Sequence, residues 1–249
     1  MPIIHTKHLF AEDTNRQQLT GELVKEIFPG TSPEAIEYEL VQQGLLQRGK
    51  LSLSLDVWNI TEDQLNALML DWEGPDIPIY IFPIKRGFEK NGVAYKKGIC
   101  LFISTKLTEK EVRALLTHEY HHMCRRVFVD DPPTLMDSLV MEGLAEDAVE
   151  NLFGSDYLSP WTKNYSLDEL QSYWESHFVT ALNQRGLSLH QPFLFGDDLL
   201  NLPPWIGYCM GYQIVQSFKD QYGPCSVKEL MQINAEDIID GAGFRRNES

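Results

Sequence analysis

The residues best placed to do chemistry in this sequence form one short segment, Thr117-His118-Glu119-Tyr120-His121-His122. His118 and His122 are four residues apart, and on a helix that spacing places both imidazoles on one face. A zinc ion accepts neutral imidazole nitrogen and takes about four ligands in a tetrahedral arrangement. Glu119 is turned away from direct ligation but reaches a water in the open coordination position. The segment therefore predicts metal-assisted hydrolysis, with Glu119 activating a zinc-bound water as general base.

A catalytic zinc site usually has three protein ligands, so two histidines leave it one ligand short. Glu142 is the best candidate, because it follows His122 by twenty residues, across a segment long enough for one helix to fold back on another. The small residues Gly143 and Ala145 would let two helices approach closely there. Glu146, one helical turn after Glu142, is placed to accept the free N–H of a ligand histidine and so fix its tautomer. The alternative is an exposed acidic helix.

The two segments together resemble a known group of enzymes. The run His118 to His122 followed by Glu142-Gly-Leu-Ala-Glu146 resembles the gluzincin branch of the zincin metallopeptidases. Residues 78–218 are more closely similar to a predicted zinc-dependent protease family typified by bacterial YjaZ-like proteins, including the late run Gly207-Tyr208-Cys-Met-Gly211-Tyr212. The resemblance implies one zinc per chain, held by His118, His122 and Glu142, with Glu119 as base. Residues 123–129 lack the continuation that a metzincin requires.

Two tyrosines of the late run are candidates for a further catalytic role. Tyr208 and Tyr212 lie one turn apart on a helix predicted to begin at Pro203-Pro204. A phenol is neutral at pH 7, so it can donate to the oxyanion of a tetrahedral intermediate without repelling the metal. We expect one of them, with Tyr208 preferred, to complete the catalytic set. Packing of both rings in the core is the competing interpretation.

The elements around the motif are predicted from periodicity and capping signals. Helices are expected over residues 15–28 and 32–44, and from a Thr61-x-x-Gln64 capping box to residue 72. Residues 77–82 predict a strand, residues 89–92 with Asn91-Gly92 predict a hairpin turn, and residues 93–95 and 99–103 predict one interrupted or two short strands, with Gly98 at a bulge. The resulting sheet has two to four strands, and its edge could accept an extended peptide.

The motif helix is expected to open at a second capping box, Thr108-x-x-Glu111. A further helix should begin near residue 135, and others should cover residues 166–184 and 203–221, with a loop over residues 192–202 and a last capping box at Ser226. Gly207 and Gly211 form a stripe of small residues on the late helix, which permits close packing against another element.

These elements predict an α+β, zincin-like fold. We expect a helical N-terminal region over residues 1–75 and a zincin-like metallopeptidase domain over residues 76–249, with one continuous globular unit as the alternative. The second region would hold the small sheet and a helix-rich active-site half.

Composition narrows the function classes. The 249 residues carry a formal net charge of −15, which disfavours nucleic acid and anionic lipid as partners, and the Lys96-Lys97 and Arg125-Arg126 pairs are best interpreted as solvated surface. There is no apolar stretch long enough for a membrane span and no secretory signal at the N-terminus. The four cysteines are widely spaced, as expected for reduced thiols. We therefore expect a cytoplasmic protein.

The function that these features favour is hydrolysis of peptide bonds by a zinc metallopeptidase acting on peptides or proteins. A catalytically inactive regulator or peptide-binding module on the same scaffold is the main alternative, and a metal-dependent hydrolase of non-peptide substrates is another. The motif specifies neither the cleavage preference nor the oligomeric state.

Overall fold

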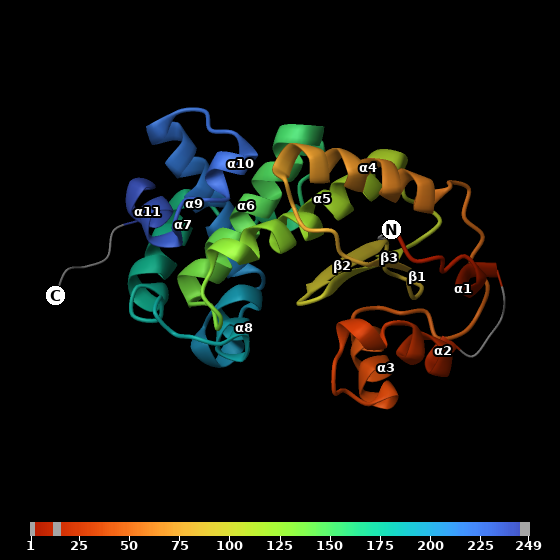
Figure 1. Cartoon of the computed structure of the whole chain (residues 1–249). Coiled ribbons are helices and arrows are strands. Elements are labelled where there is room, and N and C mark those ends of the chain that lie inside the picture. Colours follow the sequence, from red (N-terminus) through yellow and green to blue (C-terminus); the bar gives the residue numbers. More distant parts are fainter. Residues whose placement is uncertain (1–2, 12–15, 245–249) are drawn as a thin grey trace. The chain divides into compact units, whose positions relative to one another are not determined.

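The computed structural model describes residues 3–11 and 16–244 and confirms the α+β architecture. The chain divides into two compact units, Met1–Met123 and Cys124–Ser249. The first contains the sheet and the second is helical (Figure 1). The domain boundary expected after residue 75 falls inside the first unit, between a helix and the first strand, and it stays a prediction.

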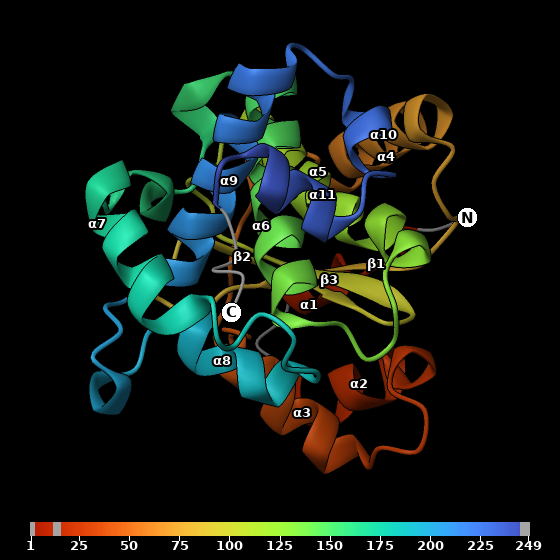
Figure 2. The ribbon, with the colours of Figure 1, turned by 90° about the vertical axis from the view of Figure 1, so that its left-hand side faces the viewer.

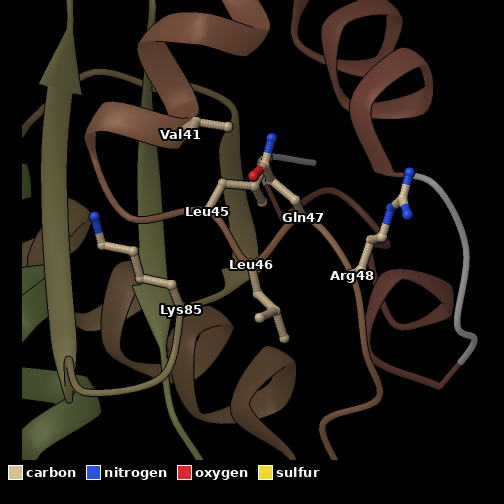
Figure 3. Close-up of a pocket in the computed structure, with 6 residues that line it drawn as sticks. All are labelled: Val41, Leu45, Leu46, Gln47, Arg48 and Lys85. Atoms are coloured by element: carbon tan, nitrogen blue, oxygen red, sulfur yellow. The ribbon is translucent and has the colours of Figure 1, made fainter.

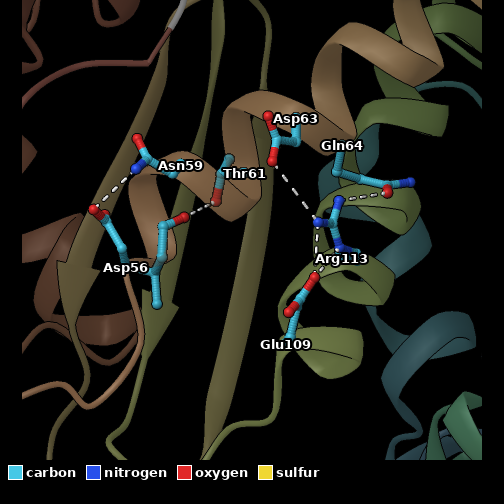
Figure 4. A network of polar contacts seen from close by, with 8 residues as sticks. Asp56, Asn59, Thr61, Asp63, Gln64, Glu109 and Arg113 are labelled. Carbon is cyan, nitrogen blue, oxygen red and sulfur yellow. Dashed lines mark hydrogen bonds and ion pairs between the residues drawn. The ribbon is translucent and has the colours of Figure 1, made fainter.

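In the described part of the chain four α-helices precede the sheet, and a side-chain cap explains the start of one of them. They are α1 (His8–Ala11), α2 (Arg16–Leu23), α3 (Pro33–Gln42) and α4 (Val57–Trp72). At α3, the Ser32 side chain accepts from the amide of Ala35 and Pro33 occupies the first turn, as predicted. The capping box expected at Thr61 is wrong, because α4 begins four residues earlier. The Thr61 hydroxyl donates to the Val57 carbonyl inside the helix, at 2.6 Å (Figure 4).

Among the residues described, the sheet has three strands in the order β1-β3-β2. Strands β1 (Ile79–Pro83) and β3 (Gly98–Ile103) are parallel, and both are buried along their whole length. Strand β2 (Lys90–Tyr95) pairs antiparallel with β3 at one edge and is half-buried. A buried pair of strands with one half-buried edge strand is the small sheet that the sequence predicts before the motif helix.

The hairpin turn lies elsewhere than predicted. Asn91 and Gly92 are inside β2, where they pair with Phe102 and Leu101, and the turn is formed by Lys96 and Lys97. Gly98, expected at a bulge, pairs with Tyr95 in a regular ladder. The local preference of Asn-Gly for a turn is overridden because buried β3 needs a six-residue partner for its backbone hydrogen bonds.

The motif helix, α5 (Glu109–Arg125), opens with the predicted capping box. The amide of Thr108 donates to a carboxylate oxygen of Glu111 at 2.7 Å, and the amide of Glu111 donates to the Thr108 hydroxyl at 3.3 Å. Arg113 links the first turns of α5 to α4. Its guanidinium donates to Glu109 of α5 at 2.8 Å and to the Gln64 side chain of α4 at 3.4 Å (Figure 4).

The second unit is built around two long helices, α6 and α9, which pack against each other and run in the same direction. Its helices are α6 (Leu135–Phe153), α7 (Leu167–Tyr173), α8 (Leu187–Phe195), α9 (Ile206–Tyr222), α10 (Val227–Leu230) and α11 (Ala235–Gly241). The predicted starts at residue 135 and after the Ser166 and Ser226 caps are confirmed. Helix α7 continues only through a π-helical turn, Trp174–Phe178, and so ends earlier than expected.

The loop predicted over residues 192–202 is partly wrong, because α8 extends to Phe195 and contains Pro192. Contacts of His190 hold this helix in place: the residue is fully buried, and its ring nitrogens lie 2.8 Å from the hydroxyl of Ser138 on α6 and 2.9 Å from the nearby Gln184 carbonyl. These partners are not visible in the local pattern of residues.

The glycines on α6 and α9 produce the close packing that the sequence predicts. A methyl group at Gly143 would overlap the carbonyl of Gly211, and a methyl group at Gly211 would overlap the carbonyl of Leu139. Gly207 meets Phe193 of α8 in the same way. The two long helices lie side by side (Figure 2), and apolar side chains from both form the core of this unit.

Arg125 corrects one prediction from composition. Expected at the solvated surface, it is 1% exposed, and its guanidinium donates to the carbonyl of Met231 near the end of α10. Burial lowers the pKa of Arg125 to about 10. The four cysteines are free, as predicted. None of the described helices combines the length and the apolar character that a membrane crossing requires.

Candidate metal centre

The side chains of His118 and His122 converge on one point. Their Nε2 atoms are 3.1 Å apart, and the two rings are nearly perpendicular, at 89°. Two nitrogens each bound about 2.0–2.1 Å from one tetrahedral zinc ion would stand roughly 3.3 Å apart. The measured separation therefore fits two imidazoles that share a metal ion.

Glu142 is the third residue of a group that could hold a metal ion. One ligand atom from each of His118, His122 and Glu142 falls within 4.8 Å of the others. Two imidazole nitrogens and one carboxylate oxygen form a donor set that catalytic zinc sites use, with a fourth position left for water. The donor chemistry of these three residues fits a zinc ion, and their assignment as its ligands stays a prediction.

Helix α4 sets the rotation of α5 about its own axis. The Gln64 amide donates to the Thr117 hydroxyl at 3.1 Å, and the Tyr120 hydroxyl donates to the Pro75 carbonyl at 3.0 Å. Tyr120 and His121 are both fully buried, and both rings pack against Trp72. Since these residues face α4, the 100° spacing of the helix turns His118, Glu119 and His122 toward a different side.

Glu119 is enclosed by the edge strand of the sheet. The residue is 5% exposed. A methyl group built on Gly92 of β2 would lie 2.5 Å from both Cγ and Oε1 of Glu119. Gly92 is a site residue that the sequence analysis missed, because Asn91-Gly92 was interpreted as a turn. The available signal was a glycine inside a run of strand-forming residues, which often marks a close approach of another group.

The second acidic residue of the Glu142 segment is held by a loop. Glu146 is 1% exposed, and its two carboxylate oxygens accept from the amide and the hydroxyl of Ser159, each at 2.8 Å. Asp147 is equally buried and pairs with Lys219. An exposed acidic helix, the alternative interpretation of this segment, is therefore wrong. The expected contact of Glu146 with a ligand histidine stays a prediction.

Comparison with known proteins agrees with this geometry. Residues 57–240 match the model of a family described as predicted Zn-dependent protease (DUF2268). The chain belongs to this family. The membership predicted from the two motifs is thereby confirmed, and the matched region runs from the first residue of α4 into α11.

Two curated relatives come from Bacillus subtilis (strain 168), and both are named as uncharacterized. The chain is 33% identical to YjaZ over 181 residues, which cover 68% of this chain and 68% of that protein. It is 32% identical to YjfC over 144 residues, which cover 53% of this chain and 48% of that protein. No solved structure matches the chain. The family description thus supplies a predicted activity, and the relatives add no measured one.

The two candidate oxyanion donors of this family member have different surroundings. The hydroxyl of Tyr212 donates to Glu150 Oε2 at 2.8 Å, and burial together with this bond raises its pKa. Tyr208 is half-buried, and its ring packs against the rings of Trp161, Phe195 and Trp205 at centroid distances of 4.9–5.3 Å. The single hydroxyl proton of Tyr212 is therefore engaged. A catalytic role of either tyrosine stays a prediction.

A cavity in the first unit is separate from these residues. It has a volume of about 420 Å³ and is lined by Val41, Leu45, Leu46, Gln47, Arg48 and Lys85 (Figure 3). Lys85 and Arg48 stand on opposite sides of the leucines. None of the predicted site residues lines this cavity, so its position gives no information about the proposed chemistry.

Proposed function

We propose that this protein is a zinc-dependent peptidase that hydrolyses peptide bonds in peptides or proteins, with one zinc per chain held by His118, His122 and Glu142. The observation that carries the proposal is the convergence of three ligand atoms within 4.8 Å, including two imidazole nitrogens 3.1 Å apart. Membership in a family of predicted Zn-dependent proteases supports the reaction class.

Glu119 has the chemistry and position of a general base. When bound, zinc would polarise the substrate carbonyl and lower the pKa of water at the open position. A carboxylate oxygen of Glu119 takes the proton of the attacking water and passes it to the nitrogen of the leaving amine. Its burial beside β2 confines the carboxylate and keeps bulk water from competing for it.

The edge strand supports a peptide as the substrate. Strand β2 ends the sheet on the side away from β1, and its Gly92 borders Glu119. An extended peptide that adds to such an edge gains backbone hydrogen bonds regardless of its side chains. We propose that β2 holds the substrate in this way, so that the scissile carbonyl lies near the base.

The test combines metal analysis with digestion of a peptide library by the wild type and by Glu119→Gln. We expect about one zinc per chain in both proteins, because Glu119 is not a ligand. Turnover should fall by about 100- to 10 000-fold in the variant, since the amide cannot take the proton. Zinc binding without cleavage of any peptide by the wild type would favour an inactive scaffold that binds peptides. Equal activity of the two proteins would rule out Glu119 as the base.

A further inference from the structure

Gly92 and Glu119 meet more closely than a side chain at position 92 would allow. A Cβ atom at Gly92 would lie 2.5 Å from Cγ, 2.5 Å from Oε1 and 2.7 Å from Cδ of Glu119. Real Cβ atoms do not approach other heavy atoms below about 3 Å, because dispersion contacts between carbons are optimal near 3.5–4.0 Å. Any larger residue at position 92 therefore requires either the strand, the helix or the Glu119 side chain to move.

The strand is held from its opposite face. Residues alternate between the two faces of a strand, so Asn91 and Tyr95 point away from the face that Gly92 presents to α5. The Asn91 amide donates to the Gln43 carbonyl at 2.9 Å, and the Tyr95 hydroxyl donates to Glu39 at 3.0 Å. All six residues of β2 also pair with buried β3. These bonds oppose a retreat of β2 from α5.

Helix α5 is also held in place by contacts with residues outside it. Directly before the motif, Thr117 accepts from Gln64 of α4, and the fully buried Tyr120 donates to the Pro75 carbonyl. Moving α5 away from β2 would break these buried contacts. The end of the Glu119 side chain is flexible, so it is the group that gives way when position 92 is enlarged.

We propose that Gly92 is a positioning residue: the missing side chain at position 92 sets where the carboxylate of Glu119 stands. This inference rests on the proposed function in so far as Glu119 is the base. A methyl group at position 92 would displace the carboxylate while leaving His118, His122 and Glu142 in place. The requirement for glycine here is steric, because β2 is a regular strand at this position and needs no left-handed backbone.

The kinetic arm compares Gly92→Ala with Gly98→Ala, a second glycine of the same sheet. A methyl group at Gly98 would also be too close to its neighbours, at 2.7 Å from Ile27 Cγ2 and 2.8 Å from the Pro78 carbonyl, but none of these is a site residue. In Gly92→Ala we expect kcat to fall on the order of 100-fold, with KM and zinc content unchanged, since a misplaced catalytic group costs about that much. In Gly98→Ala we expect a lower Tm and an unchanged kcat of the folded protein.

The second arm needs no substrate. The Tm change caused by Gly92→Ala is measured in the wild type and in Glu119→Ala. We expect a lower Tm in the wild type and no loss in Glu119→Ala, where the obstructing side chain is gone, whereas the loss from Gly98→Ala should be the same in both backgrounds.

Equal losses from Gly92→Ala in the two backgrounds, or an unchanged kcat in Gly92→Ala, would overturn the proposal. Melting reports on the contact even if the wild type cleaves no peptide. A failure of the proposed peptidase function is therefore distinguishable from a failure of the Gly92–Glu119 contact.

Discussion

The 3.1 Å between the Nε2 atoms of His118 and His122 admits two explanations. One ring can donate a hydrogen bond to the other, or both can present lone pairs to a cation. A hydrogen bond uses the two rings alone. The carboxylate of Glu142, with an oxygen within 4.8 Å of both nitrogens, adds a third donor that is anionic, which favours a cation and is not needed for a hydrogen bond between the rings. The three residues together therefore favour the metal.

Replacing Glu142 tests this assignment. Glu142→Ala should weaken zinc binding by more than the roughly 10- to 100-fold that follows loss of an outer-shell partner, because it removes a ligand. Glu146→Ala is the matched control on the same helix, and its effect should stay within that range. Competition with a chromogenic chelator measures both affinities. Full affinity in Glu142→Ala together with loss in Glu146→Ala would show that Glu146 is the ligand.

Replacing Tyr208 and Tyr212 one at a time tests which hydroxyl, if either, donates to the oxyanion. Tyr212 already donates to Glu150, so we expect Tyr208→Phe to cause the larger loss of activity. Removing an oxyanion donor costs about 2–4 kcal/mol of transition-state stabilisation, measured as kcat/KM at constant zinc content. If both Tyr→Phe variants cleave peptide at the wild-type rate, the rings serve only for packing and the oxyanion donor is another group.

At the scale of helices and strands, the orientation of the motif helix α5 depends on one helix and one strand. Helix α4 supplies Gln64 and Trp72, which fix the face that α5 presents, while β2 supplies Gly92 beside the base. The polar side chains of Figure 4 belong to this arrangement, because Arg113 joins the first turns of α5 to α4. Ligand spacing alone would not orient the motif without these contacts.

The packing of α6 on α9 gives a prediction about stability. In Gly211→Ala the added methyl overlaps the backbone carbonyl of Leu139, which cannot rotate away as a side chain could. We expect a loss of about 3 kcal/mol in the free energy of unfolding, at the upper end for overpacked cores. Urea denaturation measures the loss.

Gly154→Ala is the control for Gly211→Ala. Gly154 has a φ of +93° and a ψ of 166°, a region that is essentially restricted to glycine, and no atom within 4 Å of an added methyl, so only backbone strain of about 1–3 kcal/mol is expected. A smaller loss in Gly211→Ala than in Gly154→Ala would contradict the close approach of the two helices.

For the molecule as a whole, the region before the family match contributes to the site. The family model begins at residue 57, after α3. Yet Glu39 of α3 and Gln43 directly after it hold the face of β2 opposite Gly92. The position of the edge strand beside Glu119 therefore depends on a segment outside the matched residues.

The net charge of −15 is the other property of the whole chain. It predicts that the protein does not bind a partner with a phosphate backbone, since such a partner would be repelled without a strong basic patch. Arg125 belongs to one of the few pairs of adjacent basic residues in the sequence. It is buried against α10 and so does not contribute to such a patch.

Much of the candidate site was predictable because its signals are local. The spacing of His118 and His122, the capping boxes at Thr108, Ser166 and Ser226, and the small residues Gly207 and Gly211 each depend on residues within one or two helical turns. The α+β class follows from the same local patterns, and the family from the two motifs taken together. Sequence alone therefore determined the motif, its candidate third ligand and the elements that carry them.

The tertiary structure decided everything that depends on partners distant in the chain. Asn91 and Gly92 form a strand because β3 needs a partner for its backbone hydrogen bonds. Arg125 is buried because carbonyls more than a hundred residues away accept hydrogen bonds from its guanidinium. The Tyr212 hydroxyl on α9 donates a hydrogen bond to Glu150 on α6. In each case a weak local preference competes with hydrogen bonds and burial that exist only in the folded chain, and the folded contacts contribute more free energy.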